Sequence, residues 1–541
     1  MVDVMNALPQ FPRPANEPEF DYNADPRGRD ALEKLLASSE VVEIPAVVGG
    51  RKIFSGDIEE VRAPHDRSRL LARIHRPDEA TVRAAIADSV SASREWGALP
   101  FEKRASVFLR AAELVGQVHR HEMTAATMLG QSKTLDQAEP DAAGELIDFM
   151  RFNVYEAQKV YVNQPLTVPS AMNRTDWRPL EGFVYAVSPF NFTAIGANLC
   201  CGPALMGNVC LWKPSQKSAL ANWRFLDILQ QAGLPPGVIN FIPADPAMAT
   251  ATVLESKHFA GLHFTGSSQI FRSLWRSIGE NVERYRSLPR IVGETGGKDF
   301  VLAHPSADPA TVTTALIRGA FEYQGQKCSA ASRTYVPRSL WPKVKAALQE
   351  QLPELRVGDV AERSTFMGAV IDGASHGRLA ARIQKAKDDR EATIVSGGKV
   401  WTEPGWFVAP TVIEVTDPRH ALMRDELFGP VLTVFVYDDG RWRETLDLVD
   451  STSDYALTGS IFCVDRKALL EAETVLAQAA GNLYVNTKPT GAVVGQQPFG
   501  GSRASGTNDK AGSWMNLLRW TSPRVIKETY LPQGEWRFAG N

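Results

Sequence analysis

The chain has 541 residues, of which 44% are hydrophobic and 22% are charged, and its formal net charge is −3 at pH 7. This length allows a large core divided over roughly two to four domains, and the composition is that of an ordinary globular protein. Because the charge is almost balanced, we expect neither nucleic acid nor an anionic membrane surface as a partner.

The cysteine pattern favours a reducing compartment. The five cysteines are an odd number and are scattered without metal-ligand spacing (Cys200, Cys201, Cys210, Cys328 and Cys463), and no HExxH motif occurs. We therefore predict no metal site. The N-terminus lacks the apolar core of a signal peptide and carries acidic residues that disfavour a transit peptide, so we expect a cytoplasmic protein.

The N-terminal part is predicted to be an extended arm followed by amphipathic helices. Residues 1–40 are rich in proline, asparagine and charge, and should run along the surface. Apolar residues then recur at helical spacing in three stretches, 78–96, 101–129 and 141–160. In the second stretch, Val118 is assigned to the buried face. Glu145, near the start of the third, is either a solvated helix carboxylate or part of a binding site.

From residue 182 onward, short apolar runs alternate with helices. Residues 182–212 contain no charged side chain, but Pro189 and Pro203 interrupt them, which argues against a membrane span. The predicted strands are 183–187, 209–212, 238–242 and 262–264, and the predicted helices are 193–206, 218–232, 247–256 and 267–278. This alternation predicts a doubly wound parallel sheet, whose ligands bind beyond the carboxyl ends of the strands.

Three short stretches follow these strands and are candidate binding loops. They are Ser188 to Asn191, Lys213 to Ser215 and Thr265 to Ser267. The last is a turn of small residues that opens a helix, and its free backbone N–H groups suit a pyrophosphate. Each stretch could equally be an ordinary turn, because no GxGxxG fingerprint occurs in the chain.

A second α/β block is predicted from about residue 296. Its expected strands are 334–336, 407–415, 430–436 and 483–486. Residues 161–178 are strand-like but interrupted by Pro165 and Pro169, and are predicted to form a hairpin that leaves the main body. A strand-like stretch at 525–530 could pair with this hairpin or with a partner subunit.

Within the second block, Cys328 follows a turn at Gly325 and stands beside Lys327. A thiol presented in this way can act as a nucleophile, because a nearby positive charge favours the reactive thiolate. The alternative is that Cys328 is a small buried apolar residue, as most free cysteines are.

Several motifs occur along the chain in a fixed order. They are Pro189-Phe190-Asn191-Phe192, Trp212-Lys213-Pro214-Ser215, Phe264-Thr265-Gly266-Ser267, Gly293-Glu294-Thr295-Gly296-Gly297-Lys298, Gly325-Gln326-Lys327-Cys328, Glu426-Leu427-Phe428-Gly429-Pro430 and Pro498-Phe499-Gly500-Gly501. Together they resemble the aldehyde dehydrogenase superfamily over nearly the whole chain. The longer stretches 321–330, 495–501, 504–510 and 519–523 more narrowly resemble the Δ1-pyrroline-5-carboxylate dehydrogenases (L-glutamate γ-semialdehyde dehydrogenases).

The resemblance implies an α/β fold with two doubly wound parallel-sheet domains and an oligomerisation hairpin. The implied parts are 1–160 and 179–296 for an NAD-binding domain with the N-terminal arm, 297–487 for a catalytic domain, 161–178 and 514–541 for oligomerisation elements, and 488–513 for a substrate-anchoring loop and return segment. A homodimer or a larger homo-oligomer is expected.

The resemblance also implies covalent catalysis. Cys328 would attack an aldehyde carbon, and the Asn191 amide with the Cys328 backbone N–H would hold the oxyanion. After hydride transfer to the nicotinamide, Glu294 would deprotonate the water that hydrolyses the thioester, unless Glu294 is only a structural carboxylate. The expected reaction is NAD-dependent oxidation of L-glutamate 5-semialdehyde, from Δ1-pyrroline-5-carboxylate, to L-glutamate, the second step of proline catabolism.

Cofactor contacts are implied in the same way. Lys213 would bind the adenosine ribose and Glu426 the nicotinamide ribose. Gly266 and Ser267 would hold the pyrophosphate. The remaining expected cofactor-site residues are Ser188, Phe190, Ser215, Glu294 and Phe428. NAD is the expected cofactor. Weaker use of NADP stays open, because Gln216 stands where many NAD-preferring relatives carry an acid, and a neutral amide repels a 2′-phosphate only weakly.

Substrate contacts are expected from the loop before Pro498. The backbone N–H groups of Gly491 and Ala492 would hold a carboxylate, although some relatives carry serine in place of Ala492 and so have one more donor. Ser329 and Phe499 are expected to line the same pocket, with Glu145 nearby.

Other functions remain open at this point. An aldehyde dehydrogenase for another small semialdehyde would keep the same chemistry. A coenzyme A-acylating relative would keep the fold, but such relatives generally lack the base at the position of Glu294. A non-enzymatic scaffold is disfavoured because Cys328, Glu294, Asn191 and Lys213 occur together.

Overall fold

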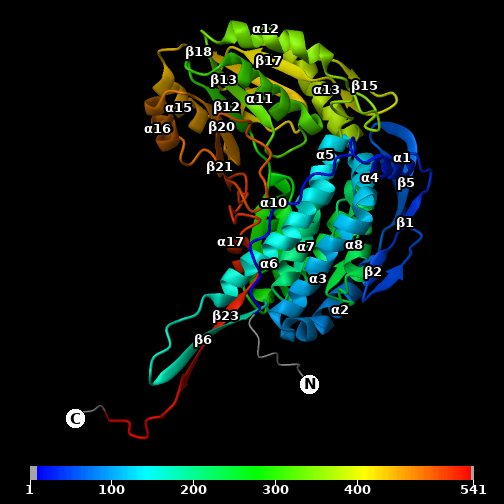
Figure 1. Ribbon diagram of the computed structural model, residues 1–541, viewed down its shortest axis with the longest axis vertical. Helices are drawn as coiled ribbons and strands as arrows, with labels where there is room; N and C mark the ends of the chain where they lie inside the picture. Colours follow the sequence, from blue (N-terminus) through cyan, green and yellow to red (C-terminus); the bar gives the residue numbers. More distant parts are fainter. Residues whose placement is uncertain (1–8, 538–541) are drawn as a thin grey trace.

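The computed structural model describes residues 9–537, which form two α/β bodies and a two-stranded ribbon that extends from the lower body (Figure 1). Residues 1–8 of the predicted arm and 538–541 of the predicted tail lie outside the described residues. In the described part, no helix has both the length and the apolar character needed to cross a membrane.

The lower body contains a sheet of seven strands in the described chain. Their order is β11 (Arg290–Glu294), β10 (Phe259–Thr265), β7 (Phe183–Val187), β8 (Val209–Lys213), β9 (Ile239–Phe241), β2 (Ala46–Val48) and β3 (Arg51–Ile53). The strands from β7 to β11 pair in parallel, which confirms the predicted doubly wound arrangement. At the other edge, β2 pairs antiparallel with β9 and with β3.

Helices pack around this sheet and bury its apolar strands in one large core. They are α2 (Glu79–Ala98), α3 (Phe101–Leu114), α4 (Arg120–Gln131), α5 (Leu135–Glu139), α6 (Leu146–Val162), α7 (Thr193–Leu205), α8 (Ala219–Gln231), α9 (Pro246–Leu254) and α10 (Ser268–Glu280). The predicted helices between 193 and 278 agree with these bounds to within about two residues at each end.

Two of the predicted N-terminal helices are interrupted. A π-helical segment, Val115–His119, separates α3 from α4, and Val118 is 65% exposed, so its assignment to a buried face is wrong. The wider turn adds a residue and rotates the apolar pattern about the axis. A second π-helical segment, Pro140–Glu145, precedes α6, so Glu145 ends a π turn inside the body and does not lie at a solvated helix start.

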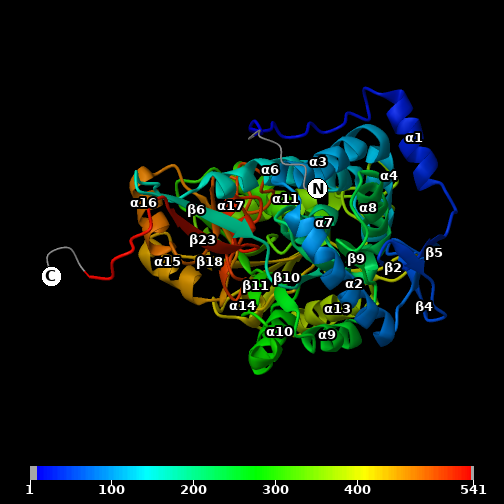
Figure 2. The ribbon, with the colours of Figure 1, turned by 90° about the horizontal axis from the view of Figure 1, so that it is seen from below.

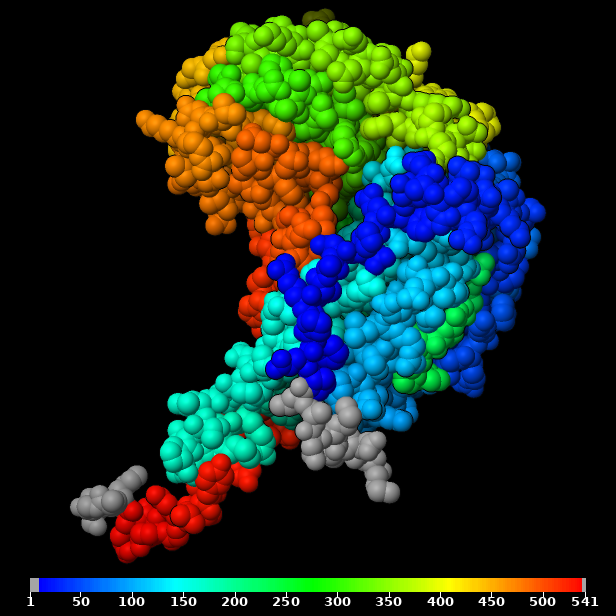
Figure 3. Space-filling view, in the orientation of Figure 1, coloured from blue at the N-terminus to red at the C-terminus, as the bar shows by residue number. Residues whose placement is uncertain are grey.

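The N-terminal segment differs in part from the predicted extended arm. Residues 9–25 do run over the surface of the lower body, as Figure 3 shows. A helix, α1 (Pro26–Leu36), then follows, and Asp25 caps it by accepting from the N–H groups of Arg27 and Gly28. An unpredicted sheet comes next, in the order β1 (Val42–Ile44), β5 (Asp66–His75) and β4 (Ile58–Ala63). These strands were not predicted because they are rich in charged residues and so lack a clear apolar pattern.

The upper body contains a second sheet of seven strands in the described residues. Their order is β14 (Ala392–Ser396), β17 (Thr411–Val415), β18 (Val431–Tyr437), β13 (Ala331–Pro337), β12 (Asp299–Ala303), β20 (Thr458–Phe462) and β21 (Asn482–Val485). All neighbours pair in parallel except β14 and β17. The helices of the second half are α11 (Pro309–Phe321), α12 (Trp341–Gln351), α13 (Gly373–Lys387), α14 (Ala421–Arg424), α15 (Trp442–Ser451), α16 (Arg466–Val475) and α17 (Trp514–Leu518).

The predicted strand over 407–415 is two strands. The first, β16 (Phe407–Val408), pairs with β15 (Val400–Trp401), whereas β17 joins the large sheet. Pro410 lies between them and has no N–H to continue a ladder. A further small pair joins β19 (Tyr455–Ala456) to β22 (Ser502–Arg503), and so ties the return segment to the upper body.

The ribbon consists of β6 (Ala171–Arg178) and β23 (Ser522–Thr529), which pair antiparallel along their whole length. Within residues 161–178, Val168 and Ala171 form an antiparallel bridge around a turn, as in the predicted hairpin, but the strand that pairs with β6 along its length comes from the other end of the chain. Figure 2, seen from below, shows the two strands side by side. Of the two partners considered for the C-terminal strand, the same chain is the one observed.

Candidate active site

The strands β7, β8, β10 and β11 pair in parallel, so their carboxyl ends lie at one edge of the lower sheet. A cavity of about 370 Å³ lies there, between α6, α7, the loop before β13 and the return segment. The structure brings one group of sequence-predicted site residues to its wall, namely Cys328, Glu294, Glu145, Ser329, Gly491, Ala492 and Phe499. The nucleophile, base and substrate residues that were predicted separately therefore share one space.

Cys328 is presented by a tight turn between α11 and β13. Tyr323 and Gln324 adopt left-handed backbone angles, with φ of 51° and 52°, and Gly325 follows with φ of 62°. A Cβ at Gly325 would collide with the carbonyl oxygen of Gly429, so only glycine fits there. Cys328 is partly exposed, whereas Cys200, Cys201, Cys210 and Cys463 are buried.

The surroundings of Cys328 favour its thiol form over the thiolate. Burial raises its pKa, and the neighbouring carboxyl groups of Asp299 and Glu294 raise it further. Formation of the thiolate therefore requires a change in this electrostatic environment, such as the arrival of a positively charged group.

Asn191 follows β7 and is buried beside this turn. Its side-chain Nδ2 donates a hydrogen bond of 3.0 Å to the carbonyl oxygen of Gln326, two residues before Cys328. One N–H of the amide is thereby held against the nucleophile loop, and the second remains for another acceptor. The neighbouring ring of Phe192 lines the cavity.

Glu294 is the last residue of β11 and reaches the same cavity. Burial raises the pKa of its carboxyl group to about 8, with Lys510 lowering it and Asp509 raising it. Gly500 approaches closely, since a Cβ there would lie 3.0 Å from Glu294 Oε1. A carboxyl group with this pKa can hold or accept a proton near neutral pH, as a general base must.

Apart from Glu294, the predicted cofactor residues do not line the cavity that contains Cys328, and most of them follow strands of the lower sheet. Lys213 ends β8, and its buried Nζ lies 3.4 Å from the Pro214 carbonyl oxygen, a long and weak hydrogen bond. Burial lowers its pKa to about 8, with the charges of Asp245 and Glu59 acting in the opposite direction. A ribose hydroxyl would give this ammonium group a closer acceptor.

Two serines near Lys213 differ in what they can offer a ligand. The Ser188 hydroxyl donates to the carbonyl oxygen of Gly196 at 2.8 Å and accepts from Trp212 Nε1 at 2.7 Å. Its side chain is therefore turned into the body, which leaves only its backbone for a ligand. Ser215 caps a short 3-10 helix and its Oγ accepts from the N–H of Lys217.

The turn after β10 and the loop after α14 complete the cofactor set. Ser267 is the N-cap of α10 and its side chain makes no capping bond, while the N–H of Gly266 donates to the carbonyl oxygen of Glu294. Glu426 accepts from the N–H of Gly297 at 3.0 Å, and burial raises its pKa to about 7. Phe428 packs edge-on against Phe190, with ring centroids 5.7 Å apart. These residues fit a dinucleotide laid along the strand ends.

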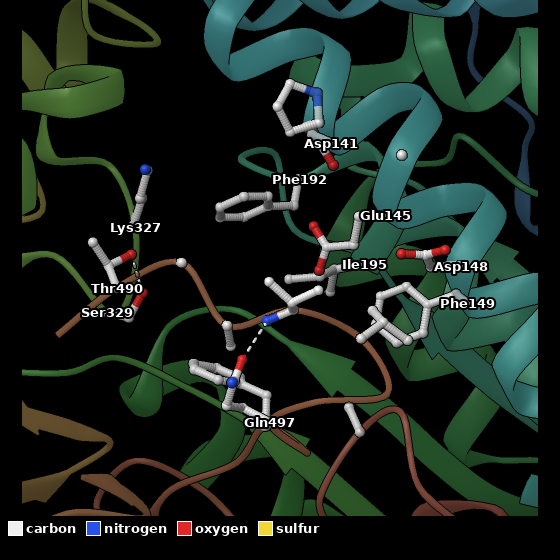
Figure 4. Close-up of a pocket in the computed structure, with 18 of the residues that line it drawn as sticks. Asp141, Glu145, Asp148, Phe149, Phe192, Ile195, Lys327, Ser329, Thr490 and Gln497 are labelled. Carbon is white, nitrogen blue, oxygen red and sulfur yellow. Dashed lines mark hydrogen bonds between the residues drawn. The ribbon is translucent and has the colours of Figure 1, made fainter. Parts of the chain in front are cut away.

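A basic side chain and two acidic side chains lie on opposite sides of the cavity, as Figure 4 shows. Lys327, Ser329 and Thr490 lie on one side, and Glu145 and Asp148 lie on the other. Burial raises the pKa of Glu145 to about 8, and the charge of Asp141 raises it further. Burial lowers the pKa of Lys327 to about 8, although the charge of Glu322 opposes this.

The basic side is organised by Glu322, which no sequence motif singled out as a site residue. Its Oε2 accepts from Lys488 Nζ at 2.8 Å and lies 3.3 Å from Lys327 Nζ. Its Oε1 accepts from Arg318 Nε at 2.6 Å. Of these charged residues, only Lys327 was noted from the sequence, because it stands next to Cys328. Glu322 and Lys488 are 166 residues apart, and no local pattern connects them.

A comparison with protein families shows that residues 55–526 match the aldehyde dehydrogenase family. The chain belongs to this family. It is 48% identical over 527 residues to the mitochondrial delta-1-pyrroline-5-carboxylate dehydrogenase of Mus musculus, covering 97% of this chain and 94% of that protein. The Homo sapiens enzyme of the same name is also 48% identical, over 528 residues, with the same coverage of both chains.

Solved structures give the same relationship. The delta-pyrroline-5-carboxylate dehydrogenase of Mycobacterium tuberculosis bound with NAD superposes with a TM-score of 0.95 at 48% identity, covering 99% of each chain. These findings confirm the predicted aldehyde dehydrogenase fold and the narrower resemblance. The expectation of a cytoplasmic protein is wrong on the same findings, because the mouse and human relatives are named as mitochondrial enzymes.

Proposed function

We propose that this chain is an NAD-dependent aldehyde dehydrogenase that oxidises L-glutamate 5-semialdehyde to L-glutamate. The semialdehyde forms when the ring of Δ1-pyrroline-5-carboxylate opens by hydrolysis, so the reaction is the second step of proline catabolism. The observation that carries the proposal is the cavity that joins Cys328 and Glu294 to a basic side chain on one wall and acidic side chains on the other. The names of the most similar relatives, and the NAD in the mycobacterial structure, support it.

Cys328 is the proposed nucleophile. Its sulfur would attack the aldehyde carbon and form a thiohemiacetal, and the oxygen would accept from the Asn191 amide and the Cys328 N–H. Removing one such donor typically lowers the rate about 10²–10³-fold. When bound, NAD supplies the hydride acceptor for the oxidation.

Glu294 is the proposed general base for release of the product. It would take a proton from the water that attacks the thioester, and L-glutamate would leave as the Cys328 thiol is restored. General-base assistance of this kind contributes about 10²–10⁴-fold. Glu294 argues against coenzyme A as the acyl acceptor, because an acylating enzyme must not activate water.

The charged walls suit a substrate that carries both an α-carboxylate and an ammonium group. The carboxylate would lie toward Lys327, Ser329 and the N–H groups of Gly491 and Ala492. The ammonium group would face Glu145 and Asp148, and Phe499 would pack on the aliphatic part. A simple aliphatic aldehyde would leave these buried polar groups unpaired, which is how such a site discriminates.

We propose that the cofactor lies along the lower sheet. Lys213 would bind the adenosine ribose, Gly266 and Ser267 the pyrophosphate region, and Glu426 the nicotinamide ribose. Ser188, Phe190, Ser215 and Phe428 would line this path. In domain terms, 1–160 with 179–296 would bind NAD, 297–487 would carry catalysis, and 488–513 would anchor the substrate.

We also infer that the segments 161–178 and 514–541, which contain the ribbon strands β6 and β23, are oligomerisation elements. Their outward side chains include Val525 and Leu531, which are 69% and 85% exposed. Exposed apolar side chains on a projecting ribbon favour contact with another subunit. A homodimer is the smallest assembly that would bury them.

The first test is NADH formation from Δ1-pyrroline-5-carboxylate, measured with the native chain, Cys328→Ala and Glu294→Gln. We expect turnover by the native chain, none by Cys328→Ala, and a single burst by Glu294→Gln. Turnover with aliphatic aldehydes but not with the semialdehyde would overturn the substrate assignment. Turnover by Cys328→Ala would overturn the mechanism.

Selective alkylation is a second test of the proposed nucleophile, and it does not depend on turnover. Iodoacetamide labelling, compared with and without NAD, should modify one thiol of the native chain, and Cys328→Ala should lose this label, because the other four cysteines are buried. A scaffold protein has no reason to keep one reactive thiol in a cavity with a general base.

A further inference from the structure

Lys133 is a buried cation that the proposed mechanism does not use. It lies in the link between α4 and α5, and its side chain is 1% exposed. Its Nζ donates to Asp141 Oδ2 at 2.6 Å. The same ammonium group lies 4.1 Å from the centroid of the Phe192 ring and 4.5 Å from that of the Tyr323 ring. Lys133 therefore touches the loop that follows Asn191 and the loop that precedes Cys328.

On the Asn191 side, Asp141 fixes the start of α7. Its carboxylate accepts from the N–H groups of Thr193 and Ala194, both at 2.9 Å, which are the first two residues of that helix. Gln131, two residues before Lys133, donates from Nε2 to Thr193 Oγ1 at 2.6 Å. A carboxylate at a helix N-terminus is favoured by the free N–H groups there. The Asn191 loop is thus held from two sides by the segment around Lys133.

On the Cys328 side, the same segment holds two strained residues. Gln324 Nε2 donates to the carbonyl oxygen of Ser132 at 2.9 Å. Ser132, Tyr323 and Gln324 all have left-handed backbone angles, with φ of 55°, 51° and 52°. Such angles are unfavourable for residues with a Cβ and persist only where surrounding contacts enforce them. The ring of Tyr323 against the ammonium group of Lys133 is one of these contacts.

We propose that Lys133, paired with Asp141, is a positioning residue that sets the separation between the Asn191 amide and the Cys328 backbone N–H. The inference rests on the proposed roles of Asn191 and Cys328 as the two oxyanion donors. These donors come from the two different α/β bodies, and the contacts of Lys133 act on their separation together with the direct bond of 3.0 Å from Asn191 Nδ2 to the Gln326 carbonyl oxygen. A desolvated ammonium group that contacts one carboxylate and two ring faces restrains all three groups at once.

A double-mutant cycle separates this role from a general structural one. The variants are Lys133→Met, Asn191→Ala and the combination, assayed for kcat and KM with Δ1-pyrroline-5-carboxylate. We expect Lys133→Met to lower kcat about 10–100-fold, since a misplaced donor loses part of the 10²–10³-fold effect of an absent one. In the Asn191→Ala background the same change should cost less than about twofold, because the donor it positions is gone.

An NAD-binding measurement and a control variant show whether the effect of Lys133→Met is local. NAD binding, followed by quenching of protein fluorescence, should be the same in Lys133→Met and the native chain, because the side-chain contacts of Lys133 are with Asp141, Phe192 and Tyr323, none of which is a predicted cofactor residue. Lys345→Met is the matched control, since Lys345 also pairs with a carboxylate, Glu414 at 2.8 Å, and lies over a ring, Trp341 at 5.7 Å, far from the cavity. It should leave kcat unchanged. If Lys133→Met does not fold, Tyr323→Leu removes the second ring face and enters the same cycle.

The outcomes are distinct. Equal losses from Lys133→Met with and without Asn191 overturn the positioning role while the native chain stays active. If the native chain oxidises only aliphatic aldehydes, the proposed substrate fails, but the cycle runs with those aldehydes and still decides the role of Lys133. A native chain that oxidises no aldehyde overturns both proposals.

Discussion

The hydroxyl groups of Ser329 and Thr490 lie 2.8 Å apart in the cavity wall. Ser329 follows the proposed nucleophile, and Thr490 precedes the proposed carboxylate-binding residues Gly491 and Ala492. One hydrogen bond thus fixes the reacting sulfur relative to the loop that would hold the far end of the substrate. Small errors in such a separation can be costly for catalysis.

Thr490→Val tests this bond, because valine keeps the shape of threonine and removes its hydroxyl group. We expect KM for Δ1-pyrroline-5-carboxylate to rise about fivefold to tenfold, corresponding to about 1 kcal/mol for one neutral hydrogen bond. The KM for NAD should not change. Thr474→Val is a suitable control, since Thr474 bonds only to the carbonyl oxygen of Leu470 on an exposed helix face. An equal rise in both KM values for Thr490→Val would contradict a local role.

The pH dependence of turnover should report Glu294. Its pKa is raised to about 8, so the carboxyl group is mostly neutral below that pH and cannot act as a base. Where thioester hydrolysis limits the rate, kcat should rise about tenfold per pH unit below pH 8 and level off above it. Measuring kcat from pH 6 to pH 9 in about half-unit steps tests this.

Glu145 is the matched control for that profile, because its pKa is also raised to about 8 in the same cavity. Glu145→Gln should keep the alkaline rise while increasing KM, whereas Glu294→Gln should stop after a single burst at every pH and so show no rise. If the rise persists in Glu294→Gln and disappears in Glu145→Gln, the two roles are reversed.

Glu322 should stabilise the folded chain above acidic pH. Burial raises its pKa, but Lys327 and Lys488 outweigh this effect and lower it from 4.5 to about 2. Because the folded value lies below the unfolded one, the contribution is complete above about pH 4.5 and is lost as the pH falls toward 2. A shift of this size corresponds to about 3 kcal/mol. Glu322→Gln should therefore lower Tm by several °C at pH 7, and by less at pH 4.

Glu414→Gln provides the comparison for Glu322→Gln. Glu414 pairs with Lys345 at 2.8 Å but is partly exposed, and such pairs are worth about 1 kcal/mol or less. Equal Tm losses for the two variants, or a Glu322→Gln loss that does not shrink on acidification, would contradict the assigned linkage.

The ribbon should control assembly. Truncation after residue 521 removes β23 and leaves β6 unpaired, so we expect light scattering to show a monomer where the native chain forms a dimer or larger species. Truncation after residue 531 keeps every strand pair of the ribbon and is the control. A dimer that persists without β23 would place the interface elsewhere.

Much of the lower body and the order of its site residues were determined locally by the sequence. The strands and helices between 183 and 280 were predicted nearly to their ends, because short apolar runs and amphipathic helices alternate there with clear turn residues. The rule that ligands bind at strand ends is enough to place Asn191 and Lys213 at one edge of the sheet. The motif around Cys328 identified the nucleophile loop.

Tertiary structure decided the rest. The π-helical turns before α4 and α6 exposed Val118 and turned Glu145 into the cavity, and helical periodicity alone does not register one inserted residue. The Ser188 hydroxyl proved to be bonded inside the body. Glu322 binds Lys488, which is remote in the chain. Lys133 contacts the rings of Phe192 and Tyr323, which also come from distant segments. Their electrostatic effects depend on burial and distance, which only the packed structure fixes.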